Sequence, residues 1–560
     1  MSYPLISKYP GNKKARSQSQ PDFRACIPRR NSMQNIIKTV LVCSVVVLSS
    51  FSVAGEKKPL VAAEKACATL IKFAGEDHAL VIKSAKLVPA GPVPQVPYQR
   101  PYAGTLEPYC RIDGVMDERI GEGGKNYAIG FAIAMPKQWN GRLMMQGGGG
   151  LNGVVAEPLG SSAAGNMTAL QRGFAVVTTD SGHQSSQGFD ASFFSDQEAV
   201  LNFLYQSTGK VAMAAKKIVA QHYQSAIEHS YYMGCSTGGR EAMIMSQRYP
   251  RLFDGIVAGA PAMRTSFSNL ADKWVMVSLA KVAPKDEQGH PIVAQALSEQ
   301  DKTIVMDALL KQCDALDGVA DKMISNVRGC NFDPMSVACS ANKSQACISP
   351  EKAKAIQVGF AGPKNSLGVQ VYPGFWFDTG ITETQGLPGL LNPGFHPVVG
   401  KITSTEMNVD QEALAASTPA AFVGDSAYWT LLNTFSNNGG KLIFYHGVSD
   451  PWFSAQETAR YYDQLVKDNG GAAKVSQWSR LFLVPGMGHC GGGSAALDYF
   501  DMIDPIVDWV EQGKAPEQVM VTGAAFPNRS RPLCPYPAFA HYTGKGDTEK
   551  ADNFVCKVPE

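Results

Sequence analysis

A Gly-x-Ser-x-Gly motif at residues 234–238 (GCSTG) constrains the fold of this chain more than any other feature. The apolar residues 230–233 before it predict a buried strand, and residues 238–248 after it predict a helix. Small residues on a sharp strand-to-helix turn expose the serine hydroxyl at the edge of a parallel sheet. The motif by itself often marks only a turn. Its position between strand and helix favours Ser236 as a nucleophile.

Strand and helix patterns alternate on both sides of the motif, which predicts a parallel sheet with crossover helices. Hydrophobic residues make up 44% of the 560 residues, enough for a large core. Residues 263–437, rich in Ala, Ser, Asn and Pro, interrupt the alternation. We therefore predict a disulfide-rich α/β-hydrolase core (55–262 and 438–560) with a large inserted domain (263–437). The predicted strands are 127–135, 142–145, 174–179, 230–233, 253–262, 441–446 and 479–484, and the predicted helices are 199–226, 238–248 and 455–467.

A serine nucleophile needs a base, and in this fold the acid and then the histidine follow the serine along the chain. His489 lies in a loop directly after the predicted strand 479–484, and Asp450 follows the predicted strand 441–446. We predict Ser236, Asp450 and His489 as nucleophile, acid and base. The alternative is that His489 is a surface-loop histidine.

Other acids and histidines fit these roles less well. Asp180 precedes the serine, so its order is wrong, and Asp425 lies in the insertion. His446 and His183 are interpreted as structural.

Acyl transfer also needs donors for the developing oxyanion. The backbone N–H of Thr237 is one candidate, and Gly148 or Gly149 in the run 146–150 (QGGGG) is the second. Bare backbone can approach a substrate closely, although a flexible glycine loop is the alternative interpretation.

The N-terminal residues 1–54 have the layout of a signal peptide, with Met33 as a second candidate start. Eight basic residues precede an apolar run at 39–53, which is too short for a transmembrane helix and ends in small residues. We expect an exported protein, periplasmic or secreted, without a stable membrane anchor. Because the net charge is only +2 and the leader is strongly basic, the remainder is mildly acidic. Nucleic-acid partners are therefore not expected.

Ten cysteines remain after the leader, an even number that implies disulfides in an exported protein. The sequence leaves their connectivity open. However, Cys235 immediately precedes Ser236, and Cys490 immediately follows His489. A disulfide between these two cysteines would tie the nucleophile to the base. Two unrelated cysteines are the alternative.

The Cys-Ser, Asp and His-Cys elements, in this order, resemble the tannase and feruloyl esterase family. Residues 146–150, 179–183 (TDSGH) and 531–537 (RPLCPYP) extend the resemblance over nearly the whole mature chain. It implies an α/β-hydrolase core with a lid inserted after the strand that follows the nucleophile. It also implies the disulfides Cys67–Cys110, Cys235–Cys490, Cys313–Cys330, Cys339–Cys347 and Cys534–Cys556.

The segment 314–321 (DALDGVAD) would by itself be interpreted as an acidic surface loop. The family carries a structural Ca²⁺ in its lid with this pattern, and hard Ca²⁺ prefers oxygen ligands from a flexible loop. The resemblance implies Asp314, Asp317 and Asp321 as side-chain ligands and Val319 and Met323 as carbonyl ligands. No cofactor is expected for catalysis.

The resemblance implies a small-molecule ester of an aromatic acid as substrate. No arginine lies between Arg328 and Arg460. This disfavours terephthalate half-esters, whose hydrolase in this family clamps a carboxylate with a lid arginine. We expect feruloyl or chlorogenate-type esters, with tannase activity on gallate esters as the alternative. Trp452 and Phe453 are better placed to stack on the acyl ring than the lid aromatics Phe375, Trp376, Phe377, Tyr428 and Trp429.

Two other classes of function stay open at this stage. One is a different exported serine hydrolase, such as a peptidase or a polyester depolymerase. The other is a catalytically inactive binding protein on the same fold.

Overall fold

The computed structural model describes residues 60–74, 79–96, 101–340, 346–384, 387–394 and 396–559. The predicted signal peptide (1–54) lies outside them. Among the described residues, no helix combines the length and apolar character that crossing a bilayer requires.

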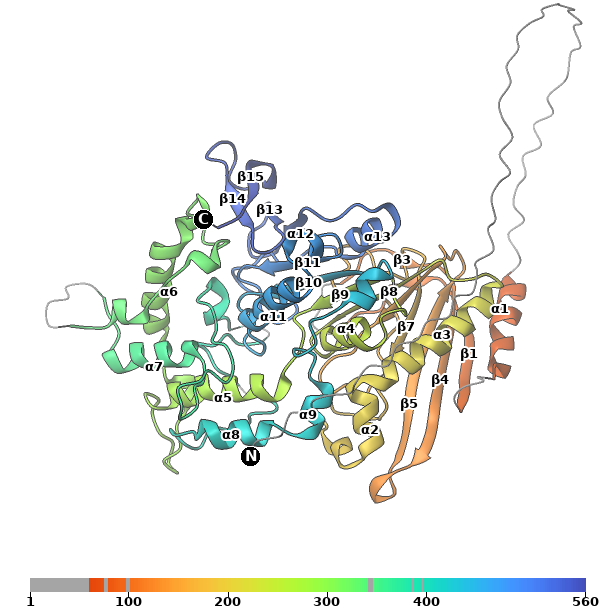
Figure 1. The fold of residues 1–560 in the computed structure, drawn as a ribbon, viewed down its shortest axis with the longest axis horizontal. Coiled ribbons are helices and arrows are strands. Elements are labelled where there is room, and N and C mark those ends of the chain that lie inside the picture. The colour runs from red at the N-terminus through yellow and green to blue at the C-terminus, as the bar shows by residue number, and fades with distance from the viewer. Residues whose placement is uncertain are drawn as a thin grey trace, which may run out of the picture. The chain divides into compact units, whose positions relative to one another are not determined.

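A nine-stranded sheet forms the centre of the fold (Figure 1). Its strands lie in the order β1-β4-β5-β7-β6-β8-β9-β10-β11. In that order their bounds are Leu80–Val88, Tyr109–Ile120, Asn126–Pro136, Ala175–Thr179, Arg142–Gln146, His229–Cys235, Gly255–Gly259, Lys441–Gly447 and Ser479–Val484. The strands predicted from β5 onward agree with these bounds to within a few residues.

The predicted parallel arrangement holds for the six strands from β7 to β11 in this order. It does not hold for β1, β4 and β5, which are antiparallel, and β5 also meets β7 antiparallel. Only residues 121–125 join β4 to β5, and so short a connection makes a hairpin rather than a crossover. β1 and β4 were not among the strands predicted from the sequence.

Helices cover both faces of the sheet because alternate strand residues point to opposite faces. Ile129, Phe131 and Ile133 of β5 pack in one core together with helices α3, α4 and α11. Ala134 packs in the opposite core, which helix α13 closes. The helices of this part of the chain are α1 (Leu60–Thr69), α2 (Gln197–Leu201), α3 (Ser207–Tyr223), α4 (Thr237–Arg248), α11 (Ala455–Asp468), α12 (Ala472–Val475) and α13 (Ile503–Gln512).

Residues 263–437 leave the sheet after β9 and return to it at β10, and these two strands pair directly. The insertion therefore adds a unit without interrupting the sheet. It has its own apolar core, to which α5, α6 and α7 contribute Val275, Leu309 and Ile356. Its helices are α5 (Thr265–Ala280), α6 (Glu299–Cys313), α7 (Pro350–Ala361), α8 (Val409–Ala416), α9 (Pro419–Gly424) and α10 (Asn433–Asn437).

Three short antiparallel pairs complete the described strands. They are β2 (Gly91–Pro92) with β3 (Thr105–Leu106), β12 (Val519–Thr522) with β13 (Ser530–Leu533), and β14 (Phe539–Tyr542) with β15 (Phe554–Lys557).

Candidate active site

Ser236 lies on a strained turn between β8 and α4. Its backbone is left-handed, with φ 64° and ψ −124°, which is unusual for a residue with a side chain. Its N–H donates to the Gly259 carbonyl at 3.0 Å, which ties the turn to β9. A Cβ on Gly234 would lie 2.8 Å from the backbone of Gly238. Gly234 is therefore required by the close approach of strand and helix, and Gly238 by the approach of the helix to Gly148, whose carbonyl oxygen would lie 2.7 Å from a Cβ.

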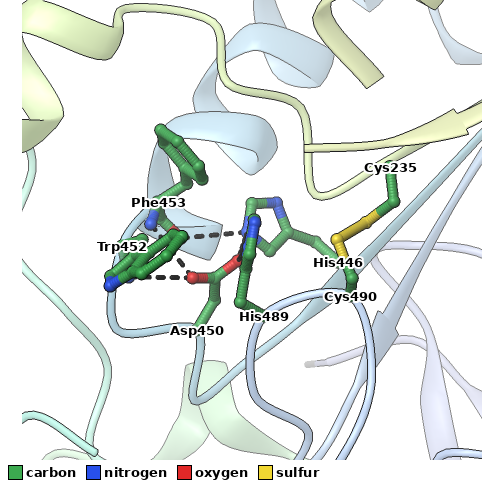
Figure 2. Close-up of a disulfide and its surroundings, with 7 residues drawn as sticks. All are labelled: Cys235, His446, Asp450, Trp452, Phe453, His489 and Cys490. Atoms are coloured by element: carbon green, nitrogen blue, oxygen red, sulfur yellow. Dashed lines mark hydrogen bonds and ion pairs between the residues drawn. A yellow bond between two sulfur atoms is a disulfide. The ribbon is translucent and has the colours of Figure 1, made fainter. Parts of the chain in front are cut away.

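His489 and Asp450 lie on the loops that follow β11 and β10, two adjacent parallel strands. Nδ1 of His489 lies 2.7 Å from Oδ2 of Asp450 (Figure 2). The other carboxylate oxygen accepts the N–H groups of Trp452 at 2.9 Å and Phe453 at 3.0 Å. Burial alone would raise the pKa of Asp450. Attraction to the protonated form of His489 and the hydrogen bonds from His446 and His489 outweigh this effect, and the pKa lies well below its usual range. Asp450 is therefore ionised.

The second imidazole nitrogen of His489 is free for chemistry. This buried Nε2 has no hydrogen-bond partner among the residues that the structure describes. Since Nδ1 faces the ionised Asp450, Nδ1 carries the proton and Nε2 is the basic nitrogen. That is the state a general base requires.

A disulfide joins the segments that carry the candidate nucleophile and the candidate base. Cys235 and Cys490 are bonded (Figure 2), with their Cα atoms 5.9 Å apart and a sequence separation of 255. Ser236 and His489 are the immediate neighbours of these cysteines, so the bond holds the nucleophile segment next to the base segment. The other disulfides also match the pairs implied by the resemblance: Cys67–Cys110, Cys313–Cys330, Cys339–Cys347 and Cys534–Cys556.

His446, set aside in the sequence analysis as structural, contacts the acid directly. Its Nε2 lies 3.2 Å from Oδ2 of Asp450, the same oxygen that His489 contacts, and 2.9 Å from the Phe453 carbonyl. Its Nδ1 lies 2.8 Å from the hydroxyl of Thr458. His446 is fully buried at the end of β10. The sequence signal for this contact was a histidine at the end of the predicted strand 441–446, four residues before Asp450.

The competing residues have other surroundings. Asp180 accepts the N–H of Gly182 at 2.9 Å in a buried turn after β7, and burial raises its pKa to about 7. His183 stacks on Phe193 with ring centroids 3.9 Å apart. Asp425 lies in the lid at the end of α9.

The two oxyanion glycines differ in their surroundings. The Gly148 N–H donates to Oε2 of Glu241 at 3.2 Å. A Cβ on Gly148 would meet the Asn152 side chain at 2.5 Å, whereas a Cβ on Gly149 would meet nothing within 4 Å. Gly149 therefore borders open space. Thr237, the third candidate, begins α4, where backbone N–H groups have no partner within the helix.

A cavity of about 440 Å³ lies beside Thr237. Phe189, Phe194 and Phe203 line it from the core, and the lid contributes Arg264 among others. These phenylalanines lie in the segment between β7 and α3 and were not predicted from the sequence. Because aromatic side chains provide flat apolar surface, the cavity suits a planar ring.

The predicted aromatic contacts are divided between site and lid. The rings of Trp452 and Phe453 lie 5.3 and 5.2 Å from the His489 ring. Phe375 and Phe377 pack within the lid core. The other predicted lid aromatics, Trp376, Tyr428 and Trp429, are not among the residues that line the cavity; Tyr428 and Trp429 are 58% and 61% exposed.

The predicted calcium loop has carboxylates that could bind a cation, but they do not converge on one point. Asp314 and Asp317 are buried, with 7% and 2% of their surface exposed. The described ion pairs of this loop involve Asp321, which contacts Arg531 and Arg529. Within the described ranges, no three acidic, histidine or cysteine side chains converge as a metal site. Two buried carboxylates thus remain that a cation would neutralise.

The fold defines the class of the protein: an α/β-hydrolase core with an inserted lid, in which Ser236, Asp450 and His489 are the candidate catalytic residues. The sequence matches the family described as "Tannase and feruloyl esterase" over residues 110–430 and 402–557. The chain belongs to this family and is a carboxylic ester hydrolase.

Individual proteins show the same relationship. The chain is 36% identical over 523 residues to mono(2-hydroxyethyl) terephthalate hydrolase of Piscinibacter sakaiensis, covering 82% of this chain and 86% of that protein. It is 28% identical over 454 residues to probable feruloyl esterase B-2 of Aspergillus terreus, covering 76% and 82%. The crystal structure of feruloyl esterase B from Aspergillus oryzae shares the fold, with a TM-score of 0.71, 23% identity and coverage of 88% and 100%.

Proposed function

We propose that this protein hydrolyses esters of phenolic acids, with feruloyl and chlorogenate-type esters preferred. One observation carries the proposal. Thr237, the residue after the strained Ser236, lines an aromatic cavity. Cys235, the residue before Ser236, is bonded to Cys490, which follows the His489 of the His–Asp pair. The acyl ring occupies the cavity, and the carbonyl carbon faces Ser236.

The residues divide the work of acyl transfer between them. His489 Nε2 takes the proton of Ser236 as Oγ attacks the carbonyl, while Asp450 stabilises the imidazolium that forms. Amide N–H groups of Thr237 and the glycine run stabilise the oxyanion. The imidazolium then protonates the leaving alcohol. Water, activated by His489, hydrolyses the acyl-enzyme and regenerates Ser236.

The charges around the cavity support a neutral acyl ring. Arg264 lines the cavity, but it is paired with Glu457 at 3.2 Å and faces Asp425 at 4.0 Å. Arg240 is buried, and its guanidinium lies over the Phe203 ring. A free carboxylate would compete with existing acids for Arg264. A terephthalate half-ester remains the second candidate because of the 36% identical relative, and gallate esters are the third.

The test is steady-state hydrolysis of methyl ferulate, chlorogenate, methyl gallate and mono(2-hydroxyethyl) terephthalate. We expect a phenolic ester to have the highest kcat/KM and Ser236→Ala to lose several orders of magnitude. Highest activity on the terephthalate half-ester would reverse the order of the candidates. Cleavage of amides or polyesters alone would identify a different serine hydrolase. A folded wild type that neither turns over esters nor reacts with a fluorophosphonate at Ser236 would be a binding protein.

Calcium and export are parts of the same proposal. Asp314, Asp317 and Asp321, with the carbonyls of Val319 and Met323, would hold Ca²⁺ in the lid, away from the reacting atoms. The buried Asp314 and Asp317 support this role. The basic and apolar leader supports export, which N-terminal sequencing of protein from the medium or periplasm would test.

A further inference from the structure

Glu241 is a buried acid beside the nucleophile that the mechanism above does not use. It lies on α4, five residues after Ser236, with 3% of its surface exposed. A carboxylate in such a position needs several hydrogen bonds, because a buried charge without partners is strongly destabilising.

The two carboxylate oxygens accept hydrogen bonds from four donors. Oε2 accepts the Gly148 N–H at 3.2 Å and the Tyr232 hydroxyl at 2.8 Å. Oε1 accepts the Asn152 amide at 2.7 Å and the Ser181 hydroxyl at 3.0 Å. Gly148 and Asn152 belong to the loop after β6, whereas the other two donors belong to β8 and to the loop after β7. The carboxylate therefore joins the glycine loop to the helix that starts at the nucleophile.

The glycine loop depends on such a contact because four consecutive glycines have no side chains to hold them. Asn152, at the end of the loop, has a left-handed backbone with φ 53°. Its side chain fills the space where a Cβ of Gly148 would lie. A second contact comes from α4 itself, where the Gly238 N–H donates to the Gly148 carbonyl at 3.0 Å. Both polar groups of Gly148 are thus bonded to α4.

We propose that Glu241 is the positioning residue of the oxyanion hole. By binding the Gly148 N–H, it orients the loop so that the Gly149 N–H, on the open side, meets the oxyanion together with the Thr237 N–H. This proposal rests on the proposed serine-esterase mechanism. Glu241 touches no substrate atom and acts through the loop.

The main test is Glu241→Gln. A carboxylate accepts all four hydrogen bonds, but a glutamine amide offers one acceptor oxygen and an NH₂ that faces the remaining donors. The loop then loses its orientation. Removing one oxyanion donor lowers kcat about 10²–10³-fold, so a displaced donor should lower it about 10–100-fold, with KM changed less than about 3-fold.

Two further variants separate positioning from stability. Asn152→Gly removes the loop-side donor and tolerates the left-handed backbone, and it should lower kcat as Glu241→Gln does. Tyr232→Phe removes one hydrogen bond to Oε2 of the same carboxylate, while the donors from Gly148 and Asn152 stay in place. It should leave kcat within about 3-fold of wild type. Thermal unfolding of all three variants measures their stability separately.

The rate of Ser236 labelling by a fluorophosphonate gives a readout that does not depend on the ester. It should fall in Glu241→Gln and Asn152→Gly but not in Tyr232→Phe. The proposal is overturned if folded Glu241→Gln keeps wild-type kcat and labelling rate, or if Tyr232→Phe loses as much as Asn152→Gly. If wild type is labelled but hydrolyses none of the phenolic esters, the substrate assignment fails while the role of Glu241 is still measured by labelling.

Discussion

Removal of the Cys235–Cys490 disulfide should reduce both stability and catalysis. The bond closes a loop of 255 residues, and each cysteine is adjacent to a predicted catalytic residue. The perturbation is the double variant Cys235→Ala/Cys490→Ala. The matched control is Cys339→Ala/Cys347→Ala, which removes a lid disulfide that spans only 8 residues.

The loop lengths set the expected magnitudes. In the chain-entropy model, closing the long loop contributes about 5 kcal/mol and closing the short one about 2.5 kcal/mol. Unfolding entropy scales with chain length, so for roughly 500 residues each kcal/mol corresponds to about 1 °C in Tm. We therefore expect Tm to fall by about 3–5 °C in the first variant and by about 1–2 °C in the control.

The effect on kcat separates the two roles of the bond. Activity is measured about 20 °C below the lower Tm, where both variants are folded. A misplacement of about 1 Å between reacting groups costs about 100-fold, so a partly loosened Ser236–His489 pair should lose about 10-fold in kcat. The control variant should keep wild-type kcat because its disulfide lies in the lid.

The reasoning would be refuted by either of two results. One is an equal fall in Tm in the control variant and in Cys235→Ala/Cys490→Ala. That result would show that the stability lost does not depend on the length of the loop that each disulfide closes. The other is wild-type kcat in Cys235→Ala/Cys490→Ala, which would show that the surrounding fold alone holds nucleophile and base together.

Four further predictions concern single sites. Asp450→Asn should lower kcat about 10³–10⁴-fold. Since the folded pKa of Asp450 is depressed, its contribution to stability is present above about pH 4 and lost as pH falls further, so acid unfolding curves of wild type and variant should converge there. His446→Gln should lower kcat about 10-fold by loosening the acid, and unchanged kcat would make the residue structural. Gly148→Ala should lower Tm because its Cβ would meet a side chain at 2.5 Å, whereas Gly149→Ala, with open space, should leave Tm nearly unchanged. EGTA should lower Tm, Ca²⁺ should restore it, and Asp317→Asn should abolish the response; a Tm indifferent to both reagents would contradict a calcium site.

Local patterns in the sequence predicted most of the α/β core. Strands β5 to β11, helix α4 and the insertion follow from the spacing of apolar residues and from glycines next to Ser236. The order of Ser236, Asp450 and His489 pointed to the same triad because each lies at the end of a predicted parallel strand. The antiparallel strands β1 and β4 were missed because only part of their side chains is buried. Their sequences therefore mix polar and apolar residues, as loops between proline-rich turns also do.

Local sequence patterns could not predict contacts between segments that are distant in the chain. A single acid on a helix, Glu241, shows no sign in the sequence that it meets Gly148 and Asn152. The phenylalanines of the cavity likewise belong to a segment without a motif. Their roles depend on how loops after β6 and β7 fold back over α4.

The sequence by itself determined the class of protein, the order of its core elements and the three residues of the candidate triad, because these depend on local spacing. The tertiary structure decided that His446 shares the oxygen of Asp450 with His489 and that Gly148 is bound by Glu241. It also decided that Arg264 is already paired where the cavity opens. Each of these depends on side chains brought together across adjacent strands or from the lid, and burial there makes the hydrogen bonds obligatory.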